Sequence, residues 1–188
     1  SYTVRLLADV YDALDVNQDK AVLTRNTAEA LEAQAQGKIS IFLGIENGSA
    51  INHSLSMLRL YYRLGVRYMT LSHSGHNDIC DSCAPAVKRW GGLSPFGREV
   101  VAEMNRLGML VDVSHISDEA FYDVLETSQA PVVATHSCCR ALAGHRRNLT
   151  DEMIRALAAK GGVVQINFYP VFLDSGFADV LKASGIEE

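Results

Sequence analysis

A glutamate and three histidines stand where their side chains could bind a metal ion. Each directly follows a short apolar run with the character of a β-strand: Glu46, His73, His115 and His136. Imidazole nitrogens and carboxylate oxygens are ordinary ligands of zinc. A single histidine after a strand is most often a hydrogen-bonding residue, but three of the six histidines in the chain share this one position. The pattern therefore predicts a metal site assembled from residues far apart in the sequence.

The elements that would position these residues alternate between strand and helix. Apolar, β-branched runs predict strands over 38–45, 66–71, 109–113, 131–135 and 163–168. Helical spacing and capping residues predict helices over 3–36 and 52–64, after the N-caps Ser94, Ser117 and Thr150, and over 174–184, with a long loop over 73–92. Strands joined through helices on short loops are parallel. Nearly continuous apolar runs are typical of strands that are buried on both faces.

Two folds built on parallel strands fit this pattern, a doubly wound open sheet and a (β/α)8 barrel of the TIM type. In a barrel the carboxyl ends of all strands point to one face, which would gather the four residues around one rim. We expect the α/β barrel, of which about five strand-helix units are present. Five strands cannot close an eight-stranded barrel, and 188 residues fall short of the roughly 250 that are typical. Residues 1–188 are thus expected to form a partial metal-dependent hydrolase barrel domain.

Composition argues against several other classes of protein. With 48% hydrophobic and 21% charged residues, the chain has the composition of an ordered globular protein. Its net charge of -5 argues against a nucleic-acid partner, which would need a basic face. No run of 18 apolar residues occurs, so no membrane-spanning segment is expected. Glycine-rich phosphate-binding motifs and the GxSxG motif of serine hydrolases are missing as well.

The remaining histidines and the first pair of cysteines carry weaker signals. His53, His76 and His145 stand in loops or at a helix start and are interpreted as surface residues. Cys80 and Cys83 form one CxxC motif, which is only half of a zinc ribbon. Ordinary loop or buried thiols are therefore expected there.

Six segments occur in order along the chain: GIENG, GVRYMTLSHSGHND, GLSPFGREVVAEMNRLGMLVDVSH, APVVATHSCCRAL, HRRNLTD and GGVVQINFYP. Together they resemble the membrane (renal) dipeptidase family of zinc metallopeptidases, which belongs to the amidohydrolase superfamily. The resemblance runs from about residue 40 to 170, and the combination of LVDVSH with HS-x-x-R-A-L makes it specific. It implies that the full-length protein hydrolyses dipeptides by means of a zinc-bound hydroxide, and it suggests a homodimer.

The resemblance also implies roles for the residues at the strand ends. Glu46 matches the carboxylate that bridges two zinc ions in this family, and His115 and His136 match the two histidines that bind the second ion. His73 matches the catalytic histidine that contacts the substrate near the reacting carbonyl.

Arg147 matches the arginine that holds the terminal carboxylate of the substrate, a role that suits a guanidinium because its fork can bind a carboxylate with two hydrogen bonds. On sequence alone Arg146 is an equal candidate. The His-x-Asp pair that binds the first zinc in the family lies on its first strand and is expected to precede Ser1. The one His-x-Asp triplet in the chain, His76-Asn77-Asp78, stands in the loop over 73–92. The aspartate that handles protons is expected to follow Glu188. We therefore expect at most one tightly held zinc in this segment, and little activity from the segment alone.

Two other classes of function stay open at this point. The chain could be a non-catalytic remnant or partner subunit that retains the fold without the first zinc site. It could also belong to another barrel metallohydrolase, such as a deaminase or a lactonase, that uses the same rim.

Overall fold

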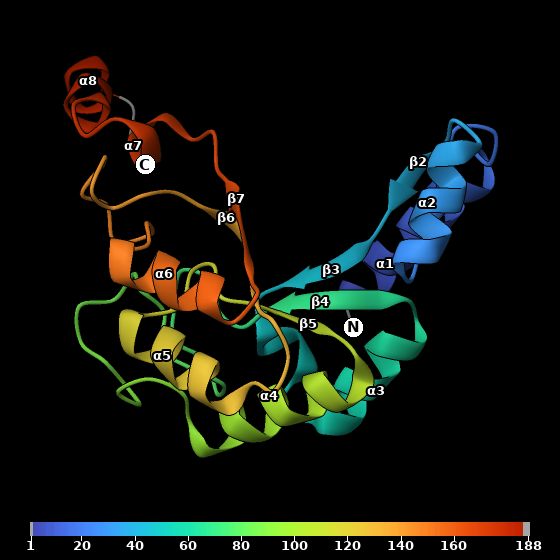
Figure 1. Ribbon diagram of the computed structural model, residues 1–188, viewed down its shortest axis with the longest axis horizontal. Coiled ribbons are helices and arrows are strands. Elements are labelled where there is room, and N and C mark those ends of the chain that lie inside the picture. Colours follow the sequence, from blue (N-terminus) through green and yellow to red (C-terminus); the bar gives the residue numbers. More distant parts are fainter. Residues whose placement is uncertain (1, 186–188) are drawn as a thin grey trace.

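The computed structural model describes residues 2–185. Helices and strands alternate along most of this range (Figure 1). The elements are α1 Tyr2–Asp15, β1 Ala21–Leu23, α2 Thr27–Ala35, β2 Ile39–Ile41, β3 Leu43–Glu46, a 3-10 turn Gly48–Ile51, α3 Leu55–Arg63, β4 Val66–Thr70, α4 Pro95–Leu107, β5 Leu110–Asp112, α5 Asp118–Thr127, β6 Val133–Ser137, α6 Asp151–Ala159, β7 Val163–Ile166, α7 Pro170–Leu173 and α8 Phe177–Ser184. Within the described range no helix has the length and apolar character needed to cross a bilayer.

The main sheet contains five parallel strands whose spatial order, β3-β4-β5-β6-β7, is their order along the chain. A doubly wound sheet would reverse its strand order midway, whereas consecutive order is that of a barrel wall. The prediction of parallel strands adjacent in chain order is therefore confirmed. The register pairs Glu46 with Thr70 and Thr70 with Asp112, so the carboxyl ends of β3, β4 and β5 lie level with one another.

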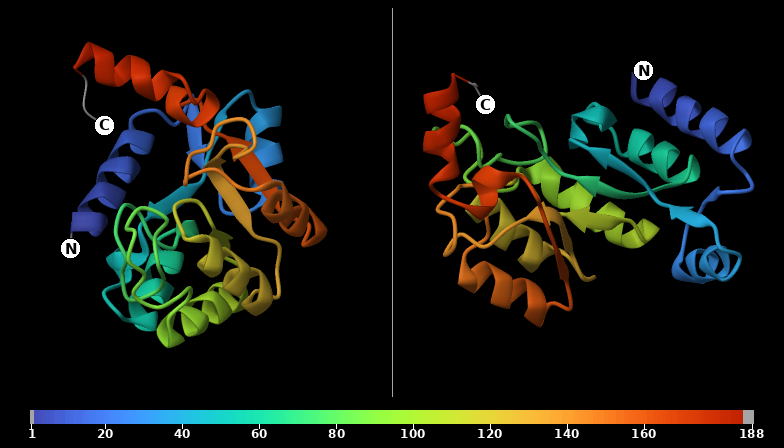
Figure 2. Two further views of the ribbon diagram at one scale, coloured as in Figure 1. Left: turned by 90° about the vertical axis from the view of Figure 1, so that its left-hand side faces the viewer. Right: turned by 90° about the horizontal axis from the view of Figure 1, so that it is seen from above.

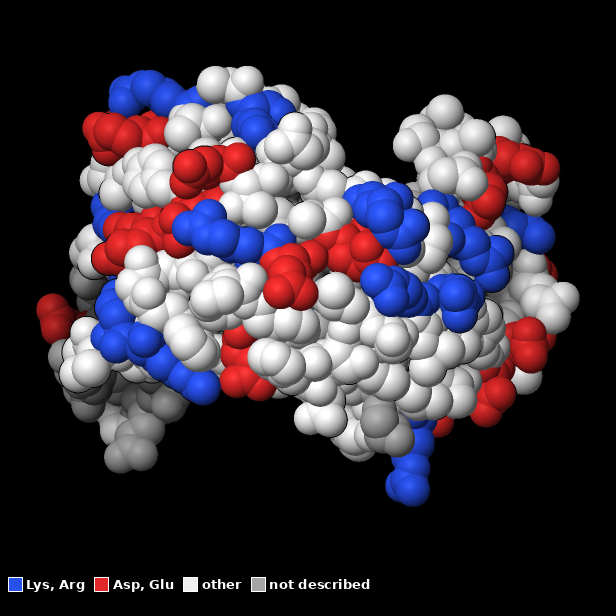
Figure 3. Space-filling view, turned by 90° about the horizontal axis from the view of Figure 1, so that it is seen from below, with Lys and Arg blue, Asp and Glu red and all other residues white. Residues whose placement is uncertain are grey.

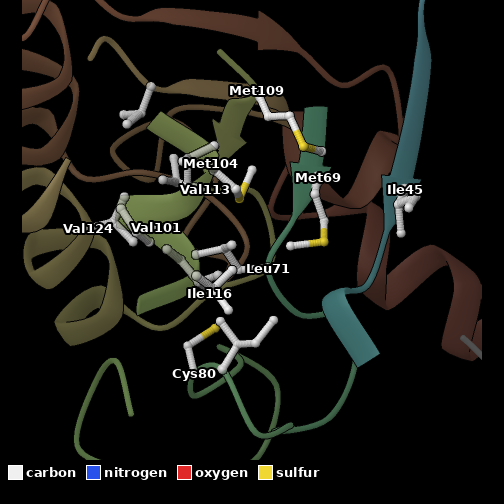
Figure 4. Packing of buried hydrophobic residues seen from close by; sticks show 14 of the residues in the cluster. Ile45, Met69, Leu71, Cys80, Val101, Met104, Met109, Val113, Ile116 and Val124 are labelled. Carbon is white, nitrogen blue, oxygen red and sulfur yellow. The ribbon is translucent and has the colours of Figure 1, made fainter. Parts of the chain in front are cut away.

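Four helices, α3 to α6, lie along one face of this sheet. In Figure 1 helices α3 to α5 are seen below the strands and α6 to the left of β6 and β7. Between them and the sheet lies the hydrophobic core. Figure 4 shows Met69 of β4 in this core, with Val101 and Met104 of α4 and Val124 of α5. Burial of apolar surface is the main favourable term in folding. This packed layer therefore holds the strands, and the residues at their carboxyl ends, in fixed positions.

Local signals set the ends of these helices as the sequence predicts. The Oγ atom of Ser94 accepts a hydrogen bond from the backbone N–H of Gly97, and Pro95 occupies the first helical position of α4. The same helix ends at Gly108, whose φ of 78° suits a residue without a Cβ. Ser117 and Thr150 cap α5 and α6 in the same way.

Ion pairs tie the outer faces of neighbouring helices together. Glu103 of α4 accepts hydrogen bonds from Arg106 on the same helix and from Arg59 on α3, and these bonds lower the pKa of Glu103 to about 2. Arg98 of α4 pairs with Asp123 of α5 at 3.0 Å. Acidic and basic side chains lie side by side on the face that these helices form, as Figure 3 shows.

The opening segment does not form the single helix predicted over 3–36. Helix α1 ends at Asp15, a turn follows in which Lys20 and Ala21 donate to the carbonyl of Asn17, and β1 then pairs with β2 in a separate two-stranded parallel sheet. The alanine and leucine content favours a helix locally, but pairing with a distant strand overrides that preference. Helix α1 lies beside α3 (Figure 2), where the hydroxyl of Tyr11 donates to the carbonyl of Leu64.

Two strand predictions also need correction. The run over 38–45 is not one strand, because β2 and β3 pair in different sheets on either side of Phe42. The strands are not all buried on both faces either. In β3 Leu43 and Ile45 are buried while Gly44 and Glu46 are exposed, and in β7 Val163 remains 57% exposed. The cause is that the helices cover only one face of the sheet.

Candidate metal centre

Glu46, His115 and His136 meet at the carboxyl ends of three strands of the main sheet. Glu46 closes β3, His115 follows β5, and His136 lies inside β6, which extends two residues beyond the predicted end at 135. The Oε1 atom of Glu46 is 3.0 Å from Nε2 of His115 and 3.1 Å from Nε2 of His136. The two Nε2 atoms are 2.9 Å apart. The predicted convergence of these three side chains is thus present in the structure.

The spacing of the three atoms fits a single metal ion. At ligand distances of about 2.1 Å, tetrahedral geometry separates two ligand atoms by about 3.4 Å. The three observed separations, 2.9 to 3.1 Å, fall within about half an ångström of that value. Two imidazoles and one carboxylate form a donor set that zinc takes in proteins. Among the described residues this is the one group of three such donors that could hold a metal ion.

His115 is placed by an unusual backbone conformation. Its φ of 72° lies in the left-handed region, which costs energy for a residue other than glycine and often marks a functional site. The carbonyl of His115 accepts hydrogen bonds from the Cys83 N–H at 2.8 Å and from the Ser82 hydroxyl at 3.3 Å. Loop 73–92 therefore holds this residue in place. Burial lowers the pKa of the imidazole to about 3, and the positive charge of Arg147 acts in the same direction.

His136 is held at several points of its backbone and ring. Its N–H donates to the Ser114 hydroxyl at 3.1 Å, and its Nδ1 lies 2.7 Å from the Thr135 hydroxyl. Its carbonyl accepts a hydrogen bond from Nη2 of Arg147 at 3.1 Å. Burial also lowers the pKa of His136, with Arg147 adding to the effect. A lowered pKa favours the neutral form of each imidazole, which is the form that binds a cation.

His73 lies at the exposed side of the same centre. Its Nε2 is 3.7 Å from Oε1 of Glu46, and its ring centroid is 4.2 Å from that of His115. Its side chain is 45% exposed, whereas that of His115 is 11% exposed. The structure therefore brings all four predicted strand-end residues together and leaves His73 as the most exposed of the three histidines.

Arg146 and Arg147, which are equal candidates for the carboxylate-binding residue on sequence alone, differ in burial in the structure. Arg147 is 9% exposed, donates to the carbonyl of His136, and has its guanidinium 5.5 Å from the ring centroid of Phe172. Burial lowers the pKa of Arg147 from its ordinary value. Arg146 is exposed and lines a separate cavity of about 160 Å³ with Cys83 and Lys88. Of the two, Arg147 is the one in contact with the residues of the metal centre.

One histidine interpreted as a surface residue lies inside the structure. The side chain of His76 is only 14% exposed, its Nδ1 accepts the Ser82 N–H, and its Nε2 is 2.7 Å from the carbonyl of Val87. The carboxylate of Asp81, fully buried, accepts backbone N–H groups of residues 89–92. Loop 73–92 folds around the side chains of His76 and Asp81. No local signal in the sequence indicates that the loop buries them. Its cysteines Cys80, which is buried, and Cys83, which is half-buried, are not joined in a disulfide bond.

Sequence reasoning also missed Asp112, a buried acid directly beneath the centre. It accepts hydrogen bonds from Thr70 and Thr135 on the two neighbouring strands. A single acidic residue inside the apolar run LVDV was the available signal, because a buried carboxylate must find hydrogen-bond donors.

Most of the chain matches a known protein family. The family described as membrane dipeptidase (peptidase family M19) matches residues 3–184. Dipeptidase aclJ of Aspergillus oryzae is 43% identical over 152 residues, which are 81% of this chain and 36% of that protein. The chain thus spans about a third of the length of this curated relative.

Two solved structures are similar in fold over about half of their length. The probable dipeptidase PvdM from Pseudomonas aeruginosa superposes with a TM-score of 0.87 at 27% identity, over 96% of this chain and 48% of that one. A metallopeptidase from Rhodobacter sphaeroides, liganded with a phosphinate mimic of the dipeptide L-Ala-D-Ala, gives a TM-score of 0.83 at 31% identity, over 89% of this chain and 49% of that one.

Proposed function

Because this chain belongs to the membrane dipeptidase family, peptidase family M19, we propose that the complete product of its reading frame hydrolyses dipeptides with zinc. The observation that carries the proposal is the triangle of Glu46, His115 and His136, whose three ligand atoms lie about 3 Å from one another. A carboxylate and two neutral imidazoles at one strand-end rim suit a catalytic zinc site, which takes three protein ligands and leaves one position open.

Each residue of the centre has a defined part in this proposal. Glu46, His115 and His136 would hold the ion, and Glu46 would also face a second ion, as in the family. When bound, zinc would lower the pKa of a bound water to about 7 and so would supply a nucleophile near neutral pH. The exposed His73 would donate a hydrogen bond to the carbonyl oxygen of the substrate as negative charge develops there.

Arg147 would hold the free carboxylate of the dipeptide. Its buried guanidinium already donates to the carbonyl of His136 and has further N–H groups to offer. A cation fixed at one distance from the metal would favour substrates whose carboxylate lies one residue beyond the scissile bond. That constraint accounts for a preference for dipeptides over longer peptides. A homodimer, which the family implies, belongs to the same proposal.

A panel of substrates tests the proposal against the rival barrel hydrolases. The complete product, stripped of metal by a chelator and reloaded with zinc, is expected to release free amino acids from simple dipeptides such as L-Ala-D-Ala. A lactone and an aminated nucleobase are expected to stay intact. Opening of the lactone or release of ammonia, with no cleavage of dipeptides, would show that the residues at the strand ends serve a different hydrolytic reaction. Absence of zinc-dependent turnover would favour a non-catalytic remnant.

The 188-residue chain alone is expected to be nearly inactive in the same assay. The reaction of the family uses two ions, whereas the described residues offer a group of three donors at one place only.

A further inference from the structure

We propose that Asp112 is a positioning residue of the metal centre, and that it acts through Thr135 to fix the tautomer and orientation of His136. The inference rests on the proposed function in one respect only, namely that the triad binds a metal ion. The hydrogen bonds that carry it belong to the protein itself.

Asp112 collects hydrogen bonds from both neighbouring strands. The side chain is fully buried, and its Oδ2 atom accepts from the hydroxyls of Thr70 on β4 and Thr135 on β6, each at 2.6 Å. Its Oδ1 atom accepts from the backbone N–H groups of Ser114 and Thr135, each at 3.0 Å. Four donors around two oxygens match an ionised carboxylate, which can only accept. The carboxylate thus holds the tips of β4, β5 and β6 together beneath the centre.

The hydroxyl of Thr135 connects Asp112 to His136. A threonine hydroxyl has a single proton, and here that proton points to the anionic Oδ2 of Asp112 at 2.6 Å. The Thr135 oxygen also lies 2.7 Å from Nδ1 of His136. With its own proton committed to Asp112, Thr135 can only accept at this second contact. Nδ1 of His136 must therefore carry the hydrogen.

The tautomer that results is the one a metal requires at this place. With the hydrogen on Nδ1, the Nε2 atom carries a lone pair, and Nε2 is the atom that faces Glu46 and His115. A hydrogen bond to the other ring nitrogen commonly orients metal-binding histidines, and loss of such a partner typically costs about 10–100-fold in metal affinity. Here a threonine stands between the carboxylate and the imidazole, so the chain Asp112–Thr135–His136 performs that task in two steps.

A matched pair of threonines separates this role from simple support of the sheet. Thr70 and Thr135 donate to the same oxygen at the same distance, but only Thr135 contacts His136. Thr135→Val and Thr70→Val should therefore lower the thermal stability by similar amounts. Thr135→Val should weaken zinc binding by about 10–100-fold, whereas Thr70→Val should change it by less than about threefold. Thr135→Ser, which keeps the hydroxyl, should restore the affinity.

The tautomer can be read without any metal, which keeps this test independent of the proposed function. In the metal-free protein with 15N-labelled histidine, NMR should show the hydrogen of His136 on Nδ1 in the wild type and in Thr70→Val, and a mixture of tautomers in Thr135→Val. A wild-type His136 with its hydrogen on Nε2 would overturn the inference. Equal losses of zinc affinity in the two valine variants would also overturn it. Zinc that fails to bind the wild type, with the tautomer as expected, would count against the proposed function alone.

Discussion

Replacing His115 with alanine is expected to lower the rate of dipeptide hydrolysis by the complete product about 10³-fold or more, because the metal supplies several kcal/mol of transition-state stabilisation. The substitution leaves Glu46 and His136 as the remaining protein ligands of the triad, fewer than the three that a catalytic zinc site uses. Measurement of kcat/KM with zinc in the assay, together with the metal content of the purified variant, checks the expectation.

His53→Ala is the matched control for this substitution. His53 also has a left-handed backbone, with φ of 54° against 72° for His115, so alanine imposes a similar backbone cost at both positions. Its side chain is exposed and lies outside the triad. The control should therefore keep nearly full activity. If the His115→Ala protein retained more than about a tenth of the wild-type rate, His115 would not be a ligand that the reaction requires.

Arg147→Ala is expected to raise the KM for dipeptides about 10–100-fold while kcat changes much less. Hydrogen bonds to a charged group contribute about 1.5–3 kcal/mol, and a carboxylate held away from the reacting bond is bound alike in ground state and transition state. Arg147→Lys should recover only part of the loss, since an ammonium group lacks the guanidinium fork. Steady-state kinetics on one dipeptide gives both parameters.

A change of substrate and a change of arginine control this result. A dipeptide amide lacks the free carboxylate, so the wild type and Arg147→Ala should hydrolyse it equally poorly. Arg146→Ala, which alters the exposed neighbour, should leave KM close to the wild-type value. An unchanged KM in Arg147→Ala, or a larger increase of KM in Arg146→Ala, would show that Arg147 is not the residue that binds the substrate carboxylate.

The features predicted correctly from the sequence depend on local signals or on one general rule. Helix α4 was predictable because Ser94, Pro95 and Gly108 mark its ends directly. The meeting of Glu46, His115 and His136 required only that the strands be parallel, since parallel strands place their carboxyl ends at one edge.

The features that were missed depend on contacts between distant segments. Strand β1 exists because β2 pairs with it, and the helical composition of residues 3–36 gives no hint of that pairing. His76 is covered because loop 73–92 folds around Asp81. The choice between Arg146 and Arg147 depended on burial, which two adjacent arginines in a loop do not reveal.

The zinc content of the 188-residue chain tests the central claim most directly. The chain would be stripped with a chelator, reloaded with zinc, freed of excess metal by gel filtration, and measured by mass spectrometry of the elements. About one zinc per chain is expected in the wild type, because Glu46, His115 and His136 provide three ligands at one place. Much less than one is expected when His115 and His136 are both replaced by alanine. Two zinc ions retained per chain, none in the wild type, or one that persists in the double variant would contradict the assignment of the metal centre to these residues.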